Sequence, residues 1–265
     1  MNHAHFAPDT GEPTVEITRV ADRHWHALED DQVVGRGEAS SRPDGRIFLS
    51  IDAWHGAVFD RIAAVMLASL PKPLYTVVDE ADLDLRHHWE RAEFLTGRHE
   101  WEYLVATDPR ATGLDSAIPP SDVTIVPVGR AKRDPLRELD RAIRAEVEVS
   151  VGWHTMPAEV LPRLDDATAM DPSRYAVAAR SDRYVGLIRL ALIPRQPRIG
   201  LIAVRADEQR LGIARALLAH VLGSLHRCGI NSATAEVDES NLAAKALFEG
   251  INARRVGSNL ELVRR

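Results

Sequence analysis

The residues best suited to chemistry form the stretch 209–214, Gln-Arg-Leu-Gly-Ile-Ala, between an apolar run at 199–204 and a helix. The apolar run predicts a buried strand, and the helix has an apolar stripe at helical spacing. Gly212 can adopt a positive φ and has no side chain to obstruct an approaching group. The first amides of a helix lack intrahelical partners and lie at the positive end of its dipole, so this junction can bind an anion such as phosphate. Arg210 and Arg215 would add positive charge.

This spacing resembles the signature of the GNAT superfamily of N-acetyltransferases: Gln or Arg, two residues, Gly, one residue, then Gly or Ala. In that family the loop amides hold the pyrophosphate of acetyl-coenzyme A, and the preceding strand pairs with its pantetheine arm. The resemblance therefore implies acetyl-CoA as co-substrate. No metal is expected, because no Cys or carboxylate is placed to complete a zinc site with the histidines of the chain. The residues that it places against the coenzyme here are Ala203, Val204, Gln209, Arg210, Leu211, Gly212, Ile213, Ala214 and Arg215. A helix start of small residues that binds no ligand is the alternative interpretation.

A second stretch supports the resemblance, because residues 234–249 predict a strand followed by an Asn-capped helix. Asn241, Ala244, Leu247 and Phe248 match the spacing of the family motif Asn-x-x-Ala-x-x-Leu-Tyr. In relatives the Asn contacts the coenzyme, and the Tyr often protonates the leaving thiolate. A phenyl ring cannot donate a proton, so Phe248 leaves two interpretations. Either water or another group protonates the thiolate, or the chain is a sensor module that binds acyl-CoA without catalysis.

Acetyl transfer to an amine needs a proton acceptor, because an ammonium ion has no lone pair with which to attack. Glu236 is the candidate general base, since a carboxylate near the amine can remove that proton. Residues 236–241, Glu-Val-Asp-Glu-Ser-Asn, resemble the Glu-Val-x-x-Ser-Asn motif of the ribosomal-protein N-terminal alanine acetyltransferases. The alternative is that Glu236 only pairs with an arginine of a neighbouring strand.

Apolar periodicity and turn residues predict a similar order of elements in both halves of the chain. The first half has expected strands near 15–20, 23–28, 47–51, 74–78 and 101–106 and helices near 57–70 and 83–92. The second has expected strands near 123–128, 175–180, 184–192, 199–204 and 260–263, with a turn at 257–259 and a helix ending before Gly152. Val34-Gly35 matches Val185-Gly186, and 78–80 matches 237–239, which indicates an internal duplication.

The fold class expected from this order is a mixed α/β sheet, with two GNAT-like units in tandem of which the first is incomplete. We expect a loose tail at 1–13, a degenerate unit at 14–108, a Pro-rich linker at 109–122 and a complete unit that binds acyl-CoA at 123–265.

The first copy lacks the chemistry of the second. It has Trp-His-Gly-Ala-Val-Phe at 54–59 where the second has the stretch 209–214. Asp82 stands where the second copy has Asn241, and a carboxylate there would repel a polyanionic coenzyme. We therefore expect the first copy not to bind coenzyme.

The sequence predicts an N-acetyltransferase that passes an acetyl or short acyl group directly to a primary amine of a small molecule or peptide. The resemblance makes Trp153, His154 and Met156 candidates to line the acceptor site, with local packing as the alternative. The net charge of −6 and a pI near 6.0 disfavour nucleic acid and anionic membranes as partners. The start of the chain lacks a signal-peptide pattern, so a cytoplasmic location is expected. Cys228, the single cysteine, is expected to be a buried apolar residue.

Overall fold

The computed structural model describes residues 15–42, 45–150, 152, 171–191, 193 and 196–265. The strands are β1 (Glu16–Ala21), β2 (His24–Glu29), β3 (Gln32–Ser41), β4 (Ile47–Ala53), β5 (Leu74–Asp79), β6 (Leu95–Ala106), β7 (Val123–Val126), β8 (Tyr175–Arg180), β9 (Arg183–Ala191), β10 (Arg198–Val204), β11 (Ser232–Asp238) and β12 (Arg254–Arg264). The helices are α1 (Gly56–Ser69), α2 (Leu83–Arg91), α3 (Pro109–Thr112), α4 (Arg133–Ser150), α5 (Ile213–Arg227) and α6 (Leu242–Glu249).

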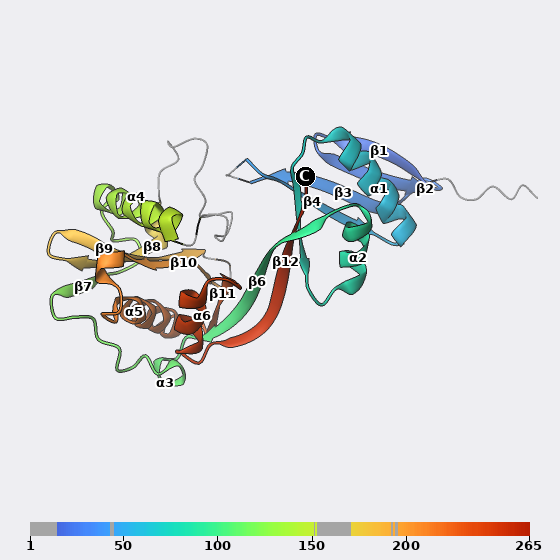
Figure 1. The fold of residues 1–265 in the computed structure, drawn as a ribbon. Coiled ribbons are helices and arrows are strands. Elements are labelled where there is room, and N and C mark those ends of the chain that lie inside the picture. The colour runs from blue at the N-terminus through green and yellow to red at the C-terminus, as the bar shows by residue number, and fades with distance from the viewer. Residues whose placement is uncertain (1–14, 43–44, 151, 153–170, 192, 194–195) are drawn as a thin grey trace, which may run out of the picture.

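All twelve of these strands form one sheet, in the order β1-β2-β3-β4-β5-β12-β6-β11-β10-β9-β8-β7. The pairs β4–β5 and β10–β11 are parallel, and the other neighbours are antiparallel. Helices α1 and α2 pack on the β1–β5 part of the sheet, whereas α4, α5 and α6 pack on the other half (Figure 1). The predicted mixed α/β class is confirmed.

The two halves of the chain exchange their last strands. β6 leaves the first half and pairs with β11 of the second, and β12 leaves the second half and pairs with β5 of the first. The two exchanged strands also pair with each other in the middle of the sheet, where they link the halves (Figure 1). Each half therefore completes the sheet of the other. The boundary expected near residue 108 divides the chain but not the sheet, which is continuous across both halves.

The structural repeat follows the predicted correspondence between the halves. Asp82 and Asn241 each cap the helix that follows, because each side chain accepts the backbone N–H three residues on. Three residues before each cap lies the last residue of the preceding strand, Asp79 or Asp238, and each is paired with the exchanged strand of the other half. The strand ends at 78–80 and 237–239 thus occupy equivalent places.

A glycine in β3 permits close packing of α1 on the sheet. A Cβ added at Gly35 would lie 2.8 Å from side-chain atoms of both Ile62 and Val58. Gly35→Ala is therefore expected to lower the free energy of unfolding by about 1–3 kcal/mol, because the helix must shift to admit a methyl group. Urea unfolding followed by circular dichroism measures this change. Gly223→Ala within α5 is the matched control, because its nearest contact would be an ordinary 3.6 Å, and a loss of stability equal to that of Gly35→Ala would contradict the packing argument.

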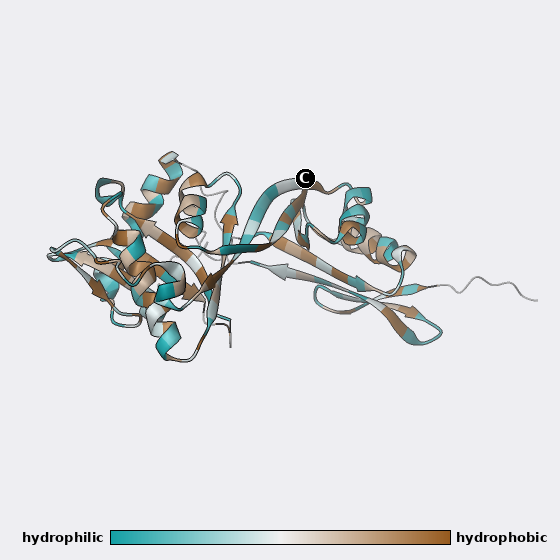
Figure 2. Ribbon diagram, turned by 90° about the horizontal axis from the view of Figure 1, so that it is seen from below, coloured by the Kyte–Doolittle hydropathy of each residue, from teal (hydrophilic) through white to brown (hydrophobic). Residues whose placement is uncertain are grey.

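Three local expectations from the sequence are wrong. β6 begins at Leu95 and not near residue 101, and residues 257–259 lie inside β12, next to a register shift, and form no turn between strands. Polar residues dominate these stretches, so their strand pattern is hidden in the sequence; Figure 2 shows hydrophilic residues along the strands that join the halves. Cys228 is exposed, because it follows the last turn of α5. In the part of the chain that the structure describes, no helix is both long and apolar enough to cross a lipid bilayer.

Candidate active site

The loop between β10 and α5 presents backbone groups to the solvent. Gly212 is the N-cap of α5 with φ 83°, and no side chain accepts a hydrogen bond at this cap. Arg210 also has a positive φ, 64°. Residues 209–212 are exposed, whereas the next residue, Ile213, is buried in the core. An exposed helix start without a side-chain acceptor leaves its first amides available to an anion.

Side chains fix the base of this loop. Gln209 folds back, and its Nε2 donates to the carbonyl of Val204 over 3.1 Å. Glu208 is only 3% exposed and accepts from Arg183 over 3.0 Å, while its other oxygen lies 2.6 Å from Nη1 of Arg180. These are charge-assisted contacts between the loop and the β8–β9 hairpin. The sequence analysis missed them, although the acidic pair at 207–208, close to several arginines, was a visible signal.

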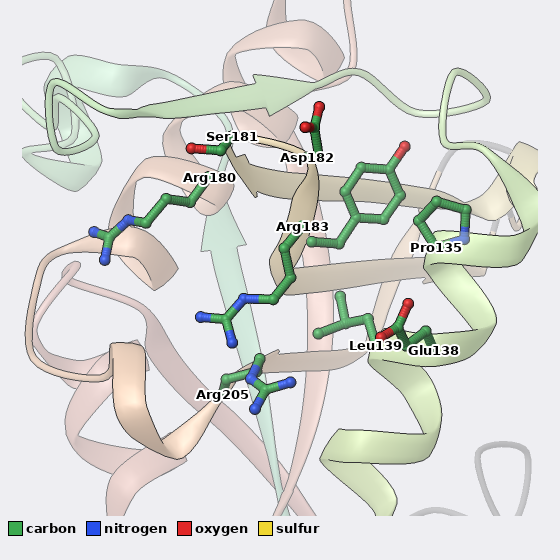
Figure 3. Close-up of a pocket in the computed structure, with 9 residues that line it drawn as sticks. Pro135, Glu138, Leu139, Arg180, Ser181, Asp182, Arg183 and Arg205 are labelled. Atoms are coloured by element: carbon green, nitrogen blue, oxygen red, sulfur yellow. The ribbon is translucent and has the colours of Figure 1, made fainter.

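A cavity of about 540 Å³ lies beside these anchors, between the first turns of α4 and the β8–β9 hairpin. Figure 3 shows the guanidinium groups of Arg180, Arg183 and Arg205 on the same side of the hairpin. Each is already engaged by an acidic residue of the loop. The hydrogen bond from Arg205 holds the pKa of Asp207 below its usual range. The cavity therefore lies beside a loop that ion pairs hold in place, and the three arginines that line it are neutralised by the acidic residues of that loop.

The parallel strands β10 and β11 pair only at their beginnings. Arg198 pairs with Thr234 and Ile199 with Ala235, and no further pair joins these two described strands. A register shift in β10 follows directly, between Ile199 and Leu201. The backbone edges beyond this point have no partner across the opening and can hydrogen-bond an extended ligand. We call the stretch in which β10 and β11 are no longer paired the opening; along β10 it runs toward the exposed loop, and the predicted coenzyme residues Ala203 and Val204 lie on this side of it.

Glu236 is the first residue of β11 beyond the paired part, so it stands at the start of the opening. Its Oε2 accepts from Nη1 of Arg198 over 2.7 Å, and the two side chains are 26% and 21% exposed. The arginine contact considered as an alternative role is therefore present. It leaves the carboxylate partly exposed and held in place, an arrangement compatible with either role.

Four carboxylates lie on one face of β6 and β11 beside this opening. Directly opposite residues of antiparallel strands project to the same face, and the register pairs Glu236 with Glu102 and Asp238 with Glu100. Like charges directly opposite each other repel. Arg98 supplies one compensating cation, because it donates to Glu100 and its Nε lies 3.9 Å from Asp238.

Glu100 is a titrating group that the sequence analysis missed. It is 8% exposed, and burial raises the pKa of this carboxyl to about 7. Arg98 lowers it, while the charges of Glu236 and Glu261 raise it. A carboxyl that titrates near neutral pH is suited to influence proton transfer. No local motif could have revealed Glu100 as a site residue, since it belongs to the first half of the chain and reaches this place only through the strand exchange.

The residues of the second motif are placed by helix α6. Asn241 caps this helix, and its Oδ1 accepts from the amide of Ala244 over 3.0 Å. Phe248 is 3% exposed and stacks on Tyr103 of β6 with ring centroids 5.7 Å apart. Phe248 thus packs in the core. Arg215 donates to the carbonyls of Gly250 and Gly113 in the structure, so it links α5 to the ends of α6 and α3.

Trp153, His154 and Met156, the candidates for the acceptor site, lie outside the described residues. Among the residues that are described, no group of three or more His, Cys, Asp or Glu side chains is arranged to hold a metal ion.

Comparison with known proteins finds a family model that matches part of the chain. Residues 139–251 match the model of the Acetyltransferase (GNAT) family, and this range contains the splayed strands, the loop and α6. Over this stretch, which we call the GNAT segment, the chain is similar to the GNAT acetyltransferases. The GNAT segment also includes Glu236 and Asn241 but ends before β12, and it excludes β6.

Individual relatives resemble the chain over different lengths. The [ribosomal protein bS18]-alanine N-acetyltransferase of Escherichia coli K12 is 46% identical over 50 residues, which is 19% of this chain and 34% of that enzyme. The chain thus matches about a third of that relative. A GCN5-related N-acetyltransferase from Sphaerobacter thermophilus has a similar fold, with a TM-score of 0.64 and 15% identity over 93% of this chain and 82% of its own. A tandem GNAT protein from the clavulanic acid biosynthesis pathway has a TM-score of 0.63 and 13% identity over 91% and 82%.

Proposed function

We propose that the chain is an N-acetyltransferase that moves an acetyl or short acyl group from coenzyme A to a primary amine within a ternary complex. The observation that carries the proposal is the opening between β10 and β11 next to an exposed helix start in the GNAT segment. In this proposal the pantetheine arm lies in the opening, and the pyrophosphate lies on the amides of residues 211–215. The acceptor is a small molecule or a peptide.

In the proposed reaction, Glu236 removes a proton from the acceptor ammonium ion. The neutral amine then attacks the thioester carbonyl, so the new C–N bond forms as the C–S bond breaks. The nitrogen loses a second proton, and the departing thiolate gains one, for which Phe248 offers no donor. Water is the simplest carrier of that proton. The contact with Arg198 holds Glu236 at the start of the opening.

The first half is proposed not to bind the coenzyme. Its strand-to-helix connection is shorter, because only Trp54 and His55 separate β4 from α1, whereas residues 205–212 separate β10 from α5. Counting from the helix caps, Val77 occupies the place of Glu236, and its side chain offers no proton acceptor. The first half thus has neither the exposed loop nor the candidate base.

Gly212→Val is expected to weaken acetyl-CoA binding at least about tenfold. A β-branched residue is strained at φ 83°, and its side chain would stand where the phosphate must approach the amides. Isothermal titration calorimetry with acetyl-CoA measures the change. Gly229→Val is the control, because it has a similar φ of 78° but lies beyond the other end of α5. Equal binding by wild type and Gly212→Val would contradict the placement of the pyrophosphate.

The proposed activity is tested by thiol release from acetyl-CoA with a panel of amines: polyamines, aminoglycosides, amino-acid derivatives and peptides with free N-termini. Release that depends on one of these amines supports the transferase. Calorimetric binding of acetyl-CoA without release for any acceptor would instead support the alternative, a sensor of acyl-CoA. Absence of binding would contradict both functions.

A further inference from the structure

The exchange of strands brings a residue of the first half to the proposed catalytic face of the second. Glu100 lies on β6, directly opposite Asp238 and diagonally across from Glu236. Diagonal neighbours on paired strands lie close enough for long side chains to interact. The charge of Glu236 indeed contributes to the raised pKa of Glu100, after the larger effects of burial and of Arg98. The two carboxyls are therefore electrostatically coupled.

The remaining charged groups around Glu100 come from three strands. Glu102 and Arg98 lie on β6 itself, and Asp238 lies on β11. Glu261 of β12 faces the same group from the other side, and it is paired with Arg46 over 2.9 Å. The carboxylates outnumber the arginines beside Glu100, so adding one more negative charge there is costly. This is the arrangement in which one carboxyl of a coupled set retains its proton to a higher pH.

We propose that Glu100 is a positioning residue that is electrostatically coupled to Glu236, and that its ionisation makes Glu236 the stronger proton acceptor for the amine. This inference depends on the proposed acetyltransferase function. When Glu100 carries a proton, Glu236 has one fewer negative neighbour and holds a proton from the substrate less well. When Glu100 loses that proton to solvent, the added charge favours the protonated form of Glu236. The first half of the chain would thus take part in catalysis although it does not bind the coenzyme.

The sign of the expected pH dependence follows from this coupling. As pH rises through about 7, Glu100 ionises, Glu236 becomes the better base, and kcat/KM increases. In Glu100→Gln this rise should disappear, and the rate at high pH should be about three- to tenfold lower than in wild type, because a single like charge changes base strength by about one pKa unit. The coenzyme Kd should not change, since Glu100 does not touch the loop at 205–212.

Glu261→Gln provides a test that a purely structural role for Glu100 would not affect. Gln can still accept the hydrogen bond from Arg46, but the negative charge that raises the pKa of Glu100 is removed. The increase of kcat/KM with pH should therefore move to lower pH, while the rate at high pH stays as in wild type. Thermal unfolding of each variant checks that it is folded. If Glu100→Gln does not fold, the Glu261→Gln profile decides alone.

The coupling of Glu100 to Glu236 would be overturned if kcat/KM still increased near pH 7 in Glu100→Gln, or if this increase stayed at the same pH in Glu261→Gln. Either result would leave the acetyltransferase function intact. If no amine of the panel causes the wild-type protein to release thiol at any pH, the proposed function is rejected, and the coupling of Glu100 to Glu236 with it. The proposal is supported if the increase of kcat/KM with pH disappears in Glu100→Gln and moves to lower pH in Glu261→Gln.

Discussion

A chain of residues 107–265 alone is expected to show no cooperative unfolding and no heat with acetyl-CoA. Removing residues 1–106 takes away both β5 and β6. It leaves β11 without β6 along all of Ser232–Asp238, and it leaves β12 without either neighbour. It also removes Tyr103 and Val105, which are 1% and 0% exposed, from the core beneath α5 and α6. Losing a single large buried side chain costs about 3–5 kcal/mol, against a total stability of about 5–15 kcal/mol.

Circular dichroism during urea unfolding, followed by calorimetry, tests this expectation. The matched control is a chain of residues 82–265, which keeps α2 and β6 and should recover part of the ordered signal. If the chain of 107–265 unfolds cooperatively and binds acetyl-CoA as the full chain does, the exchanged strand is dispensable. The second half would then be an independent unit, and the first half would have no role in its stability.

Glu236→Gln is expected to lower kcat by about 10²- to 10⁴-fold, the usual contribution of a general base. The amide is nearly isosteric and can still accept the hydrogen bond from Arg198, so the position of the side chain is retained while its basicity is lost. The Kd for acetyl-CoA should remain within about twofold, because in the proposed complex the loop amides and not this residue hold the coenzyme. Steady-state thiol release with the best acceptor from the panel measures the effect.

Glu239→Gln is the matched control for that variant. It makes the same change three residues further along, at a carboxylate that contacts Nδ1 of His99 over 2.9 Å. We expect its kcat to stay near that of wild type. An unaltered rate and pH profile in Glu236→Gln would assign the residue to its ion pair with Arg198 alone, and another group or water would have to take the proton.

The sequence determined the parts of the candidate site whose information is local. The Gly at the start of α5, the Asn that caps α6 and the place of Glu236 before it follow from spacing along one stretch of chain, and the structure has the cap and the positive φ. Helix and strand periods are also local, which is why most elements were predicted within a few residues. The coenzyme contacts and the role of Glu236 stay predictions.

The tertiary structure alone decided which strands meet. Strand pairing depends on free energy gained between segments far apart in the chain, and the residue pattern of β6 does not specify β11 as its partner. Only that pairing sets Glu100 opposite Asp238, buries it and raises its pKa, and only that pairing stacks Tyr103 on Phe248. The charge of a single glutamate in the first half thus depends on a neighbour supplied by the second, because burial and Coulomb repulsion act through space and not along the sequence.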